Sequence, residues 1–459
     1  MRLVDAADLE SRARTSSGFI PSLLVTRLLE LGHEPEVESR ARRGEWFCAL
    51  EWARLLGERQ QHEPALDVLA PYVATGWWPA ARARAELLEG WGRPDEAIAL
   101  CHPYAQSGDP LVLDFVARLL ARHGQAPEAF DLLQPGIEGW FLAQALVDVA
   151  EAAGRNEEAA ALLQARIEAA VPACDDPDCH RLRLEPSNAF DLLATVRERQ
   201  GRIDEAIALL RRRDVTSVNG RDALADLLAR HDRIEELRAY AATEPLGDAA
   251  RSLAEVLEEH GDVDGAISVY RTFAEESDGM WHVAHLLSQL LVRHGQVDEA
   301  IAVMQALADS PYGADGCVVD GLCTLYAEHG RAREGLAYLD ALKERRGGKE
   351  EWDFFRMRLP LMVDCGLRDE AIEQAREHPE GGTWYAAWFL SDLLAGAGRL
   401  EEAVAVLEQY PASTSTVLAR HLIDLGRIEE AVRVLQVPAS AAPAPDDPWN
   451  DTHSDEPPF

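Results

Sequence analysis

Lysine is almost absent from this 459-residue sequence, since only Lys343 and Lys349 among its 45 basic residues are lysines. Together with abundant alanine, glycine and arginine, this indicates a GC-rich bacterial gene, of actinobacterial type. Positive charge is scarce as well, because 80 acidic residues leave a net charge of −35. Such a field repels a phosphate backbone or an anionic bilayer at long range. We therefore expect neither nucleic acid nor membrane as a partner, and favour a protein or a basic or extended peptide.

Long hydrophobic runs are also missing. No stretch approaches the roughly 18 apolar residues that would cross a bilayer. The first residues, MRLVDAADLE, lack the basic and apolar regions of a secretory signal. The seven cysteines are odd in number and mostly occur in apolar helical patterns, which is typical of a reduced compartment. We expect a cytoplasmic protein of unknown oligomeric state.

Motifs of known catalytic and nucleotide-binding sites do not occur. The sequence has no Walker phosphate loop, dinucleotide fingerprint, H-E-x-x-H or G-x-S-x-G motif. His282 and His285 could hold a metal, but such a pair is more often a polar helix face. Cys174, Cys179 and His180 give three clear ligands where zinc usually takes four. We expect no metal, no cofactor and no enzymatic activity; an enzyme with an unrecognised site is the least favoured alternative.

One phrase runs through nearly the whole chain. Its clear copies begin with GRPDEAIAL at Gly92 and end with GRIEEAVRVL at Gly426, and weaker copies start at Gly32, Gln60 and Asp232. The thirteen copies start, in order, at Gly32, Gln60, Gly92, Gly124, Gly154, Gly201, Asp232, Gly261, Gly295, Gly330, Gly366, Gly398 and Gly426. Their mean spacing is about 33 residues, and periods of 20–50 residues indicate a solenoid.

Each copy predicts the turn of a helical hairpin. The apolar pattern before it is helical, and glycine best tolerates the left-handed backbone that ends a helix. Acidic residues then fall in the first turn of the second helix, where the helix dipole favours them. Alanine follows five residues after most turns, as at Ala97 and Ala206, and a second small residue often lies seven before, as at Ala85 and Ser288. Two facing small residues let the helices pack closely.

These spacings resemble the tetratricopeptide repeat family over about Phe19 to Val437. The resemblance implies an all-α fold, a right-handed superhelix of about thirteen helical hairpins. The sequence departs from the family motif, because the helix A tryptophan and the closing proline are mostly missing. A pentatricopeptide RNA-binding array has a similar period, but the net charge argues against it. A generic helical bundle would not repeat its turns in phase.

The pattern breaks at three places. Residues 171–186 insert a Pro-rich acidic loop between hairpins. Asp232 replaces the turn glycine and Leu237 the small residue, which predicts a boundary there. Residues 438–459 contain six prolines, five acidic residues and no lysine or arginine, which is typical of a disordered tail. We thus expect an extension (1–18), arrays at 19–231 and 232–437, and the tail, in which Trp449 and Phe459 could be docking anchors.

The resemblance also implies where a partner binds. In that family helix A lines the concave face, so residues ten, six and three before each turn would point into a groove. This face is mostly acidic, and its lack of lysine argues against the grip on a chaperone carboxylate used by some family members. The predicted groove consists of Asp191, Thr195, Glu198, Asp222, Asp226, Arg251, Glu255, His285, Gln289, Asp320, Thr324, Arg356, Trp388 and Asp392.

Two functions fit this groove. The first is an interaction scaffold that binds a protein or extended peptide, and the second is a regulatory subunit of a separately encoded enzyme or transcription factor. Because both the groove and the tail are acidic, we expect the tail to stay out of the groove.

Overall fold

The computed structural model describes residues 5–15, 19–168, 183–212, 217–218, 221–276, 281–310 and 316–435. Contacts between backbone positions divide the chain into two units, which differ from the predicted division at Asp232. Unit 1 combines both ends of the chain, residues 1–87 and 350–459, and unit 2 comprises residues 88–349. Helix α6 (Trp78–Gly90) contributes to both ranges.

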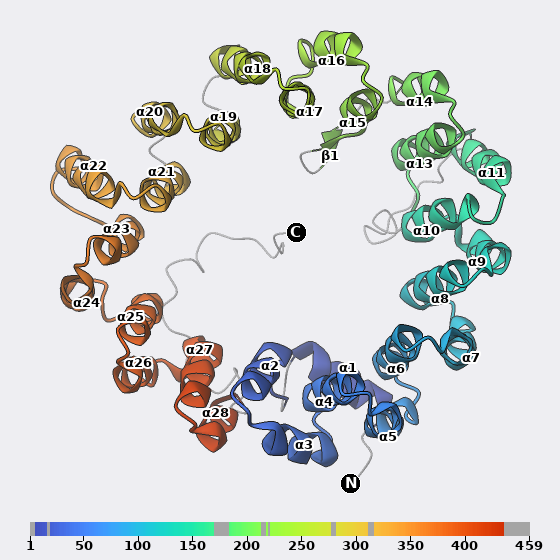
Figure 1. The fold of residues 1–459 in the computed structure, drawn as a ribbon, viewed down its shortest axis with the longest axis horizontal. Helices are drawn as coiled ribbons and strands as arrows, with labels where there is room; N and C mark the ends of the chain where they lie inside the picture. The colour runs from blue at the N-terminus through green and yellow to red at the C-terminus, as the bar shows by residue number, and fades with distance from the viewer. Residues whose placement is uncertain are drawn as a thin grey trace, which may run out of the picture. The chain divides into compact units, whose positions relative to one another are not determined.

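Unit 1 consists of helical hairpins (Figure 1). Its N-terminal helices are α1 (Ala6–Thr15), α2 (Ser22–Glu30), α3 (Glu34–Arg43), α4 (Trp46–Glu58) and α5 (His62–Val73). Its C-terminal helices are α23 (Trp352–Asp364), α24 (Arg368–Glu377), α25 (Trp384–Gly396), α26 (Leu400–Leu407), α27 (Pro411–Asp424) and α28 (Ile428–Leu435).

Unit 2 repeats the same hairpin. Its first helices are α7 (Pro94–Ala105), α8 (Pro110–Arg122), α9 (Ala126–Leu133), α10 (Trp140–Ala150), α11 (Asn156–Glu168), α13 (Pro186–Arg199) and α14 (Ile203–Leu210). They are followed by α15 (Ala223–Arg230), α16 (Ile234–Ala241), α17 (Asp248–Glu259), α18 (Val263–Glu276), α19 (Trp281–Arg293), α20 (Val297–Ala308), α21 (Gly316–Glu328) and α22 (Ala332–Arg345). In the described part, the strands are the antiparallel two-residue pair β1 (Ser217–Val218) and β2 (Arg221–Asp222).

The predicted turns are confirmed at all thirteen positions. Each of the eleven turn glycines has a positive φ, as do Gln60 (φ 62°) and Asp232 (φ 53°). The helix before each turn is called the A helix and the one after it the B helix. The ten alanines five residues after a turn are all fully buried, and Ala85, Ser288 and the other small residues before the turns are buried too. These small residues lie in the core of most hairpins, as the sequence predicted.

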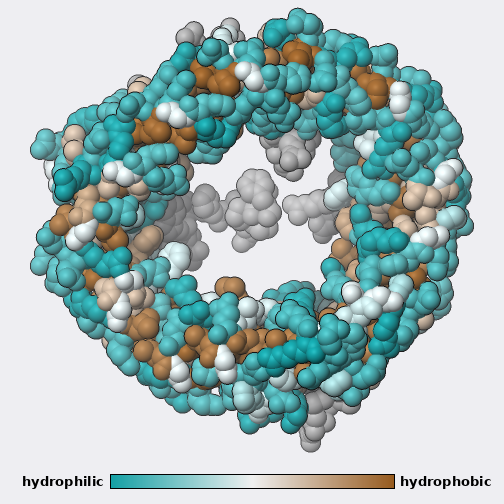
Figure 2. Space-filling view, viewed as in Figure 1, coloured by the Kyte–Doolittle hydropathy of each residue, from teal (hydrophilic) through white to brown (hydrophobic). Residues whose placement is uncertain are grey.

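The A and B helices of unit 2 form two layers, with the A helices α8, α10, α13, α15, α17, α19 and α21 on one side and their B helices on the other (Figure 1). Each hairpin packs on its sequence neighbours, as α11 does on α13 and α20 on α21. The viewed face is mostly hydrophilic, with hydrophobic residues in smaller patches (Figure 2). Such nearest-neighbour packing is the rule for repeat arrays.

In unit 1 the first hairpin packs on the last. Helix α2 contacts α27, so residues about 400 positions apart in the sequence become neighbours (Figure 1). Arg27 Nε donates to Asp424 Oδ1 at 2.8 Å, and Arg40 Nη2 donates to Glu429 Oε1 at 3.3 Å. We call this contact of α2–α3 with α27–α28 the seam. It joins the chain ends within one unit, which the sequence did not predict.

Candidate functional site

The candidate site is the exposed side of the A helices. We define the A-helix face as the residues ten and six positions before each turn. In unit 2, Thr195 and Asp226 are half-buried, whereas Glu255, Gln289 and Thr324 are exposed. The remaining predicted residues of this unit at these positions, Asp191, Arg251, His285 and Asp320, are half-buried and each makes polar or electrostatic contacts.

Asp222 does not belong to this face, which corrects the prediction. Its side chain is fully buried. Oδ1 accepts a hydrogen bond from the Ala225 backbone N–H at 2.9 Å, and Oδ2 accepts one from the Tyr240 hydroxyl at 2.6 Å. Helix α15 starts only at Ala223, so Asp222 is its N-cap and not a residue of an exposed helical turn. Its role is to hold α15 against α16.

Glu198, three residues before its turn, is occupied by the next hairpin. Its carboxylate accepts hydrogen bonds from Arg230 Nε at 3.0 Å and lies 2.8 Å from His231 Nε2. Burial raises the pKa of Glu198, but the bonds from Arg230 and His231 outweigh it, and the pKa is lowered. The same arrangement joins Glu89 to Arg122 and His123, and Glu258 to Arg293 and His294. These carboxylates link successive hairpins, so they are not available to a partner.

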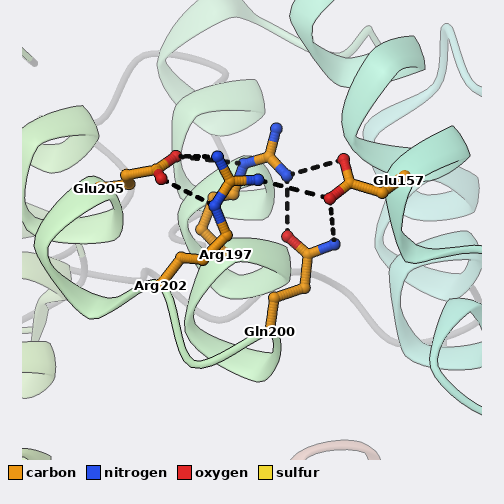
Figure 3. A network of polar contacts seen from close by, with 5 residues as sticks. All are labelled: Glu157, Arg197, Gln200, Arg202 and Glu205. Atoms are coloured by element: carbon orange, nitrogen blue, oxygen red, sulfur yellow. Dashed lines mark hydrogen bonds and ion pairs between the residues drawn. The ribbon is translucent and has the colours of Figure 1, made fainter.

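A second link uses the repeated phrase itself. The arginine after the turn binds the glutamate three residues later and an acidic residue of the preceding B helix. Arg202 thus pairs with Glu205 at 2.6 Å and with Glu157 at 3.4 Å, while Arg197 reaches the same Glu157 at 3.1 Å (Figure 3). The pattern recurs around Arg155, Arg233, Arg331, Arg399 and Arg427. The acidic residues in the first turn therefore also form ion pairs between successive hairpins. The sequence predicted only their interaction with the helix dipole.

The A-helix face of unit 2 remains predominantly acidic once Asp222 is removed. Some of its charge is compensated locally, because Arg251 Nη1 lies 3.1 Å from Glu255 Oε1 and Arg118 pairs with Asp114 and Asp148 at 2.6 and 3.2 Å. Ser252 Oγ donates a hydrogen bond to Asp226 Oδ1 at 3.1 Å. The face also includes residues of α8 and α10 that the prediction omitted. Its charged members are the carboxylates Asp114, Asp148, Asp191, Asp226, Glu255 and Asp320 and the guanidinium groups of Arg118 and Arg251.

The predicted residues Arg356, Trp388 and Asp392 lie in unit 1, so they are a separate group. Arg356 packs on the Phe389 ring with its Cζ 5.9 Å from the centroid. Asp392 Oδ1 accepts a hydrogen bond from Arg420 Nη2 at 3.0 Å. Trp388 is exposed. At the two positions of the A-helix face, unit 1 carries the arginines Arg54, Arg82, Arg356 and Arg420 and the carboxylates Glu86 and Asp392. Its sign is therefore opposite to that of unit 2.

A hollow of about 540 Å³ lies between the B helices α3 and α5 of unit 1. Trp52 and Leu56 of α4 line it together with Val68 and Tyr72 of α5, while Glu38 of α3 adds a polar group. Its volume is within the usual range for small-molecule pockets. Nothing in the repeat pattern predicted it.

Within the described ranges, no group of three or more His, Cys, Asp or Glu side chains is arranged to hold a metal ion. Cys174, Cys179 and His180 lie outside the described residues. No described helix combines the length and apolar character needed to cross a membrane.

Comparison with known proteins gives structural matches only. No family model and no curated protein matches the chain. Among solved structures, a complex described as Naa15/Naa10 bound to HypK-THB matches 90% of this chain and 74% of its own, with 14% identity and a TM-score of 0.41. A tetratricopeptide repeat protein from Parabacteroides merdae ATCC 43184 matches 65% of this chain and 99% of its own, with 14% identity and a TM-score of 0.27.

The fold is tetratricopeptide-like. The assignment rests on the hairpins of this chain, with their thirteen left-handed turns and facing small residues. Similarities this distant do not identify the partner or the activity of this chain.

Proposed function

We propose that the chain is a non-catalytic scaffold that binds a basic or extended peptide segment of a partner protein along the A-helix face of unit 2. Arrays of this fold are generally non-catalytic, and their repeated surfaces suit extended ligands. The observation that carries the proposal is the row of carboxylates at the two face positions of α8, α10, α13, α15, α17 and α21, from Asp114 to Asp320. Because neighbouring like charges raise the local field, this surface attracts cationic groups.

The net charge supports a protein as the partner, and the cysteines support a cytoplasmic location. A net charge of −35 disfavours nucleic acid and anionic membranes. The five cysteines in the described ranges are free thiols, as expected for a bacterial cytoplasm. Three of them, Cys48, Cys101 and Cys323, are buried, and burial raises the pKa of the Cys48 thiol. They therefore have the character of packing residues and not of reactive thiols.

Isosteric neutralisation tests the site. The variant Asp226→Asn/Glu255→Gln/Asp320→Asn removes three charges from the A-helix face without adding bulk. Wild type is first used to isolate a stoichiometric partner from the native cell, identified by mass spectrometry. We expect the triple variant to bind that partner at least about tenfold more weakly at low salt, with a smaller salt dependence, since exposed charges are screened within about 10 Å at 0.1 M salt.

A charge-matched control separates a site from a general field. Glu128→Gln/Glu259→Gln/Asp264→Asn removes three exposed carboxylates that have no hydrogen-bond or ion-pair partner among the described residues. We expect this variant to bind like wild type. Equal weakening by both triple variants would mean that net charge alone attracts the partner. If the partner is an enzyme or transcription factor whose activity changes on binding, the chain is a regulatory subunit.

A further inference from the structure

Helix α25 exposes two tryptophans on one side. Trp384 is 39% exposed and Trp388 is 43% exposed, and Asp392 follows one turn later on the same side. The opposite side is buried through Ala387, Leu390 and other small or aliphatic residues. Exposed tryptophans spaced four residues apart form a continuous aromatic stripe on a helix. Neither indole N–H has a hydrogen-bond partner in the described part of unit 1, whereas the buried Trp77 donates to Glu10 Oε2 at 2.8 Å.

Guanidinium groups flank this stripe on both sides. Arg356 comes from the neighbouring helix α23, and Arg420 comes from α27. Arg420 pairs with Asp392, and Arg356 lies 3.6 Å from Asp353 Oδ1. Both pairs are substantially exposed, and such pairs exchange partners at little free-energy cost. The stripe therefore offers aromatic rings with cations at their edges, unlike the acidic A-helix face of unit 2.

The chain continues beyond α28 with a segment of matching chemistry. Residues 436–459 include six prolines, five acidic residues, Trp449 and Phe459, and no lysine or arginine. Proline-rich segments in an extended conformation bind to exposed aromatic rings. The sequence APAPDDPW, from Ala442 to Trp449, places two carboxylates directly before a proline and a tryptophan. Its acidic residues complement Arg356 and Arg420, and its rings complement the tryptophans.

The position of α28 allows this contact within one molecule. B helices end at the edge of the array where the next A helix begins, as α26 ends at Leu407 just before α27 begins at Pro411. Leu435, the last residue of α28, and Trp384, the first residue of α25, thus lie at the same edge. Helix α28 packs on α27 and α27 on α25, a separation of about 20 Å at usual helix spacings. The 14 residues from Leu435 to Trp449 extend up to about 46 Å.

We propose that the C-terminal segment 436–459 docks on the stripe of Trp384 and Trp388 in the same chain, with Trp449 as its anchor. The expectation that an acidic tail is repelled rests on the carboxylates of the A-helix face of unit 2, whereas that face of unit 1 carries four arginines and two carboxylates. This inference is independent of the proposed partner site, which lies on other helices.

Fluorine NMR of the full chain labelled with 5-fluorotryptophan tests the proposal. The Trp449 signal is identified as the one that Trp449→Phe removes. We expect it to be broadened and shifted relative to a synthetic peptide of residues 436–459. In Trp384→Ala/Trp388→Ala it should return to the peptide position, because loss of tryptophan anchors weakens a contact by about tenfold or more. Trp140→Ala, which removes a tryptophan of equal exposure (43%) at the start of α10, should leave it unchanged.

A second measurement needs no change on the folded surface. In the full chain with Trp449→Ala and Phe459→Ala, the signals of Trp384 and Trp388 should shift, whereas that of Trp140 should not. A Trp449 signal at the peptide position in wild type would overturn the proposal. So would a docked signal that survives Trp384→Ala/Trp388→Ala, since the segment would then bind elsewhere, for example in the hollow between α3 and α5. A shift that depends on protein concentration would also overturn it, because it would indicate a second copy.

Discussion

One buried position of the repeat differs in α27, the last A helix of the chain. Five residues before most turns the A helix carries a buried aliphatic side chain, such as Leu119, Leu290 or Leu361. In α27 this position is His421, which is 3% exposed and has no hydrogen-bond partner for either ring nitrogen in the described part. Leaving a buried polar group unpaired costs about 1–3 kcal/mol. Helix α27 therefore carries a free-energy cost that an aliphatic side chain at this position avoids.

His421 should make the packing of helix α27 sensitive to acid. Burial lowers its pKa, and Arg420 lowers it further, although Asp392 and Asp424 oppose this. The unfolded state then binds the proton more tightly, so the contribution to stability is complete above about pH 6.5 and is lost as the pH falls below it. We expect His421→Leu to raise the melting temperature by about 2–4 °C at pH 5.5.

Thermal unfolding followed by circular dichroism between pH 7.5 and 5.5 measures this effect. His102→Gln, at an exposed histidine of α7, is the control and should keep the wild-type slope. A wild-type slope in His421→Leu would show that His421 does not titrate with folding.

The residues fixed by local chemistry were predictable. Turn positions and facing small residues follow from backbone conformation and close packing, and even Gln60 and Asp232 keep the left-handed turn. Side chains that form hydrogen bonds with other helices were not predictable. Glu198 and Asp222 fit the register of an exposed face, but their partners Arg230 and Tyr240 come from other helices, and a helix start at Ala223 cannot be read from the periodicity.

At the scale of the elements, neighbouring hairpins are joined by charged links as well as by packing. Glu157 of α11 accepts hydrogen bonds from Arg197, Gln200 and Arg202 of the next hairpin (Figure 3). The hydrogen bond from Arg197 is the main cause of its lowered pKa. This link joins α11 to α13 and α14, the described helices before and after the predicted insertion at residues 171–186.

Glu157→Gln should loosen the hairpin α13–α14 while leaving its fold intact. The isosteric amide keeps the size of the side chain but loses both ion pairs, and exposed pairs of this kind change local opening roughly two- to fivefold. Hydrogen exchange by mass spectrometry should show faster exchange over Pro186–Leu210. Glu128→Gln on α9 removes an equally exposed carboxylate without a described partner and should have no such effect. Identical exchange in the two variants would mean that packing alone joins these hairpins.

At the scale of the whole chain, its two ends belong to one unit. The sequence suggested a boundary at Asp232, where the glycine and the small residue are both lost. Yet Leu237 is fully buried there, and Arg233 bonds to Asp204 of the preceding B helix at 2.9 Å, so the array continues. The two units of the structure instead group the chain ends, whose seam joins residues far apart in the sequence. Local patterns predicted the thirteen hairpins but contain no information about which of them meet from opposite ends.

Removing the last hairpin should therefore loosen the first. In an open repeat array, deletion of a terminal hairpin affects only its sequence neighbour. Here, a chain that ends at Gln409 lacks α27 and α28. Because α27 packs on α2, we expect its loss to expose buried side chains of α2, among Leu24, Val25 and Leu28, to water. We expect hydrogen exchange in Ser22–Glu30 to rise at least about tenfold.

A chain ending at Leu435 keeps both helices and should retain wild-type exchange in α2. The variant Asp424→Asn/Glu429→Gln, which removes only the ion pairs to Arg27 and Arg40, should give an intermediate increase. Unchanged exchange in α2 after loss of α27 and α28 would mean that the two chain ends do not meet in solution.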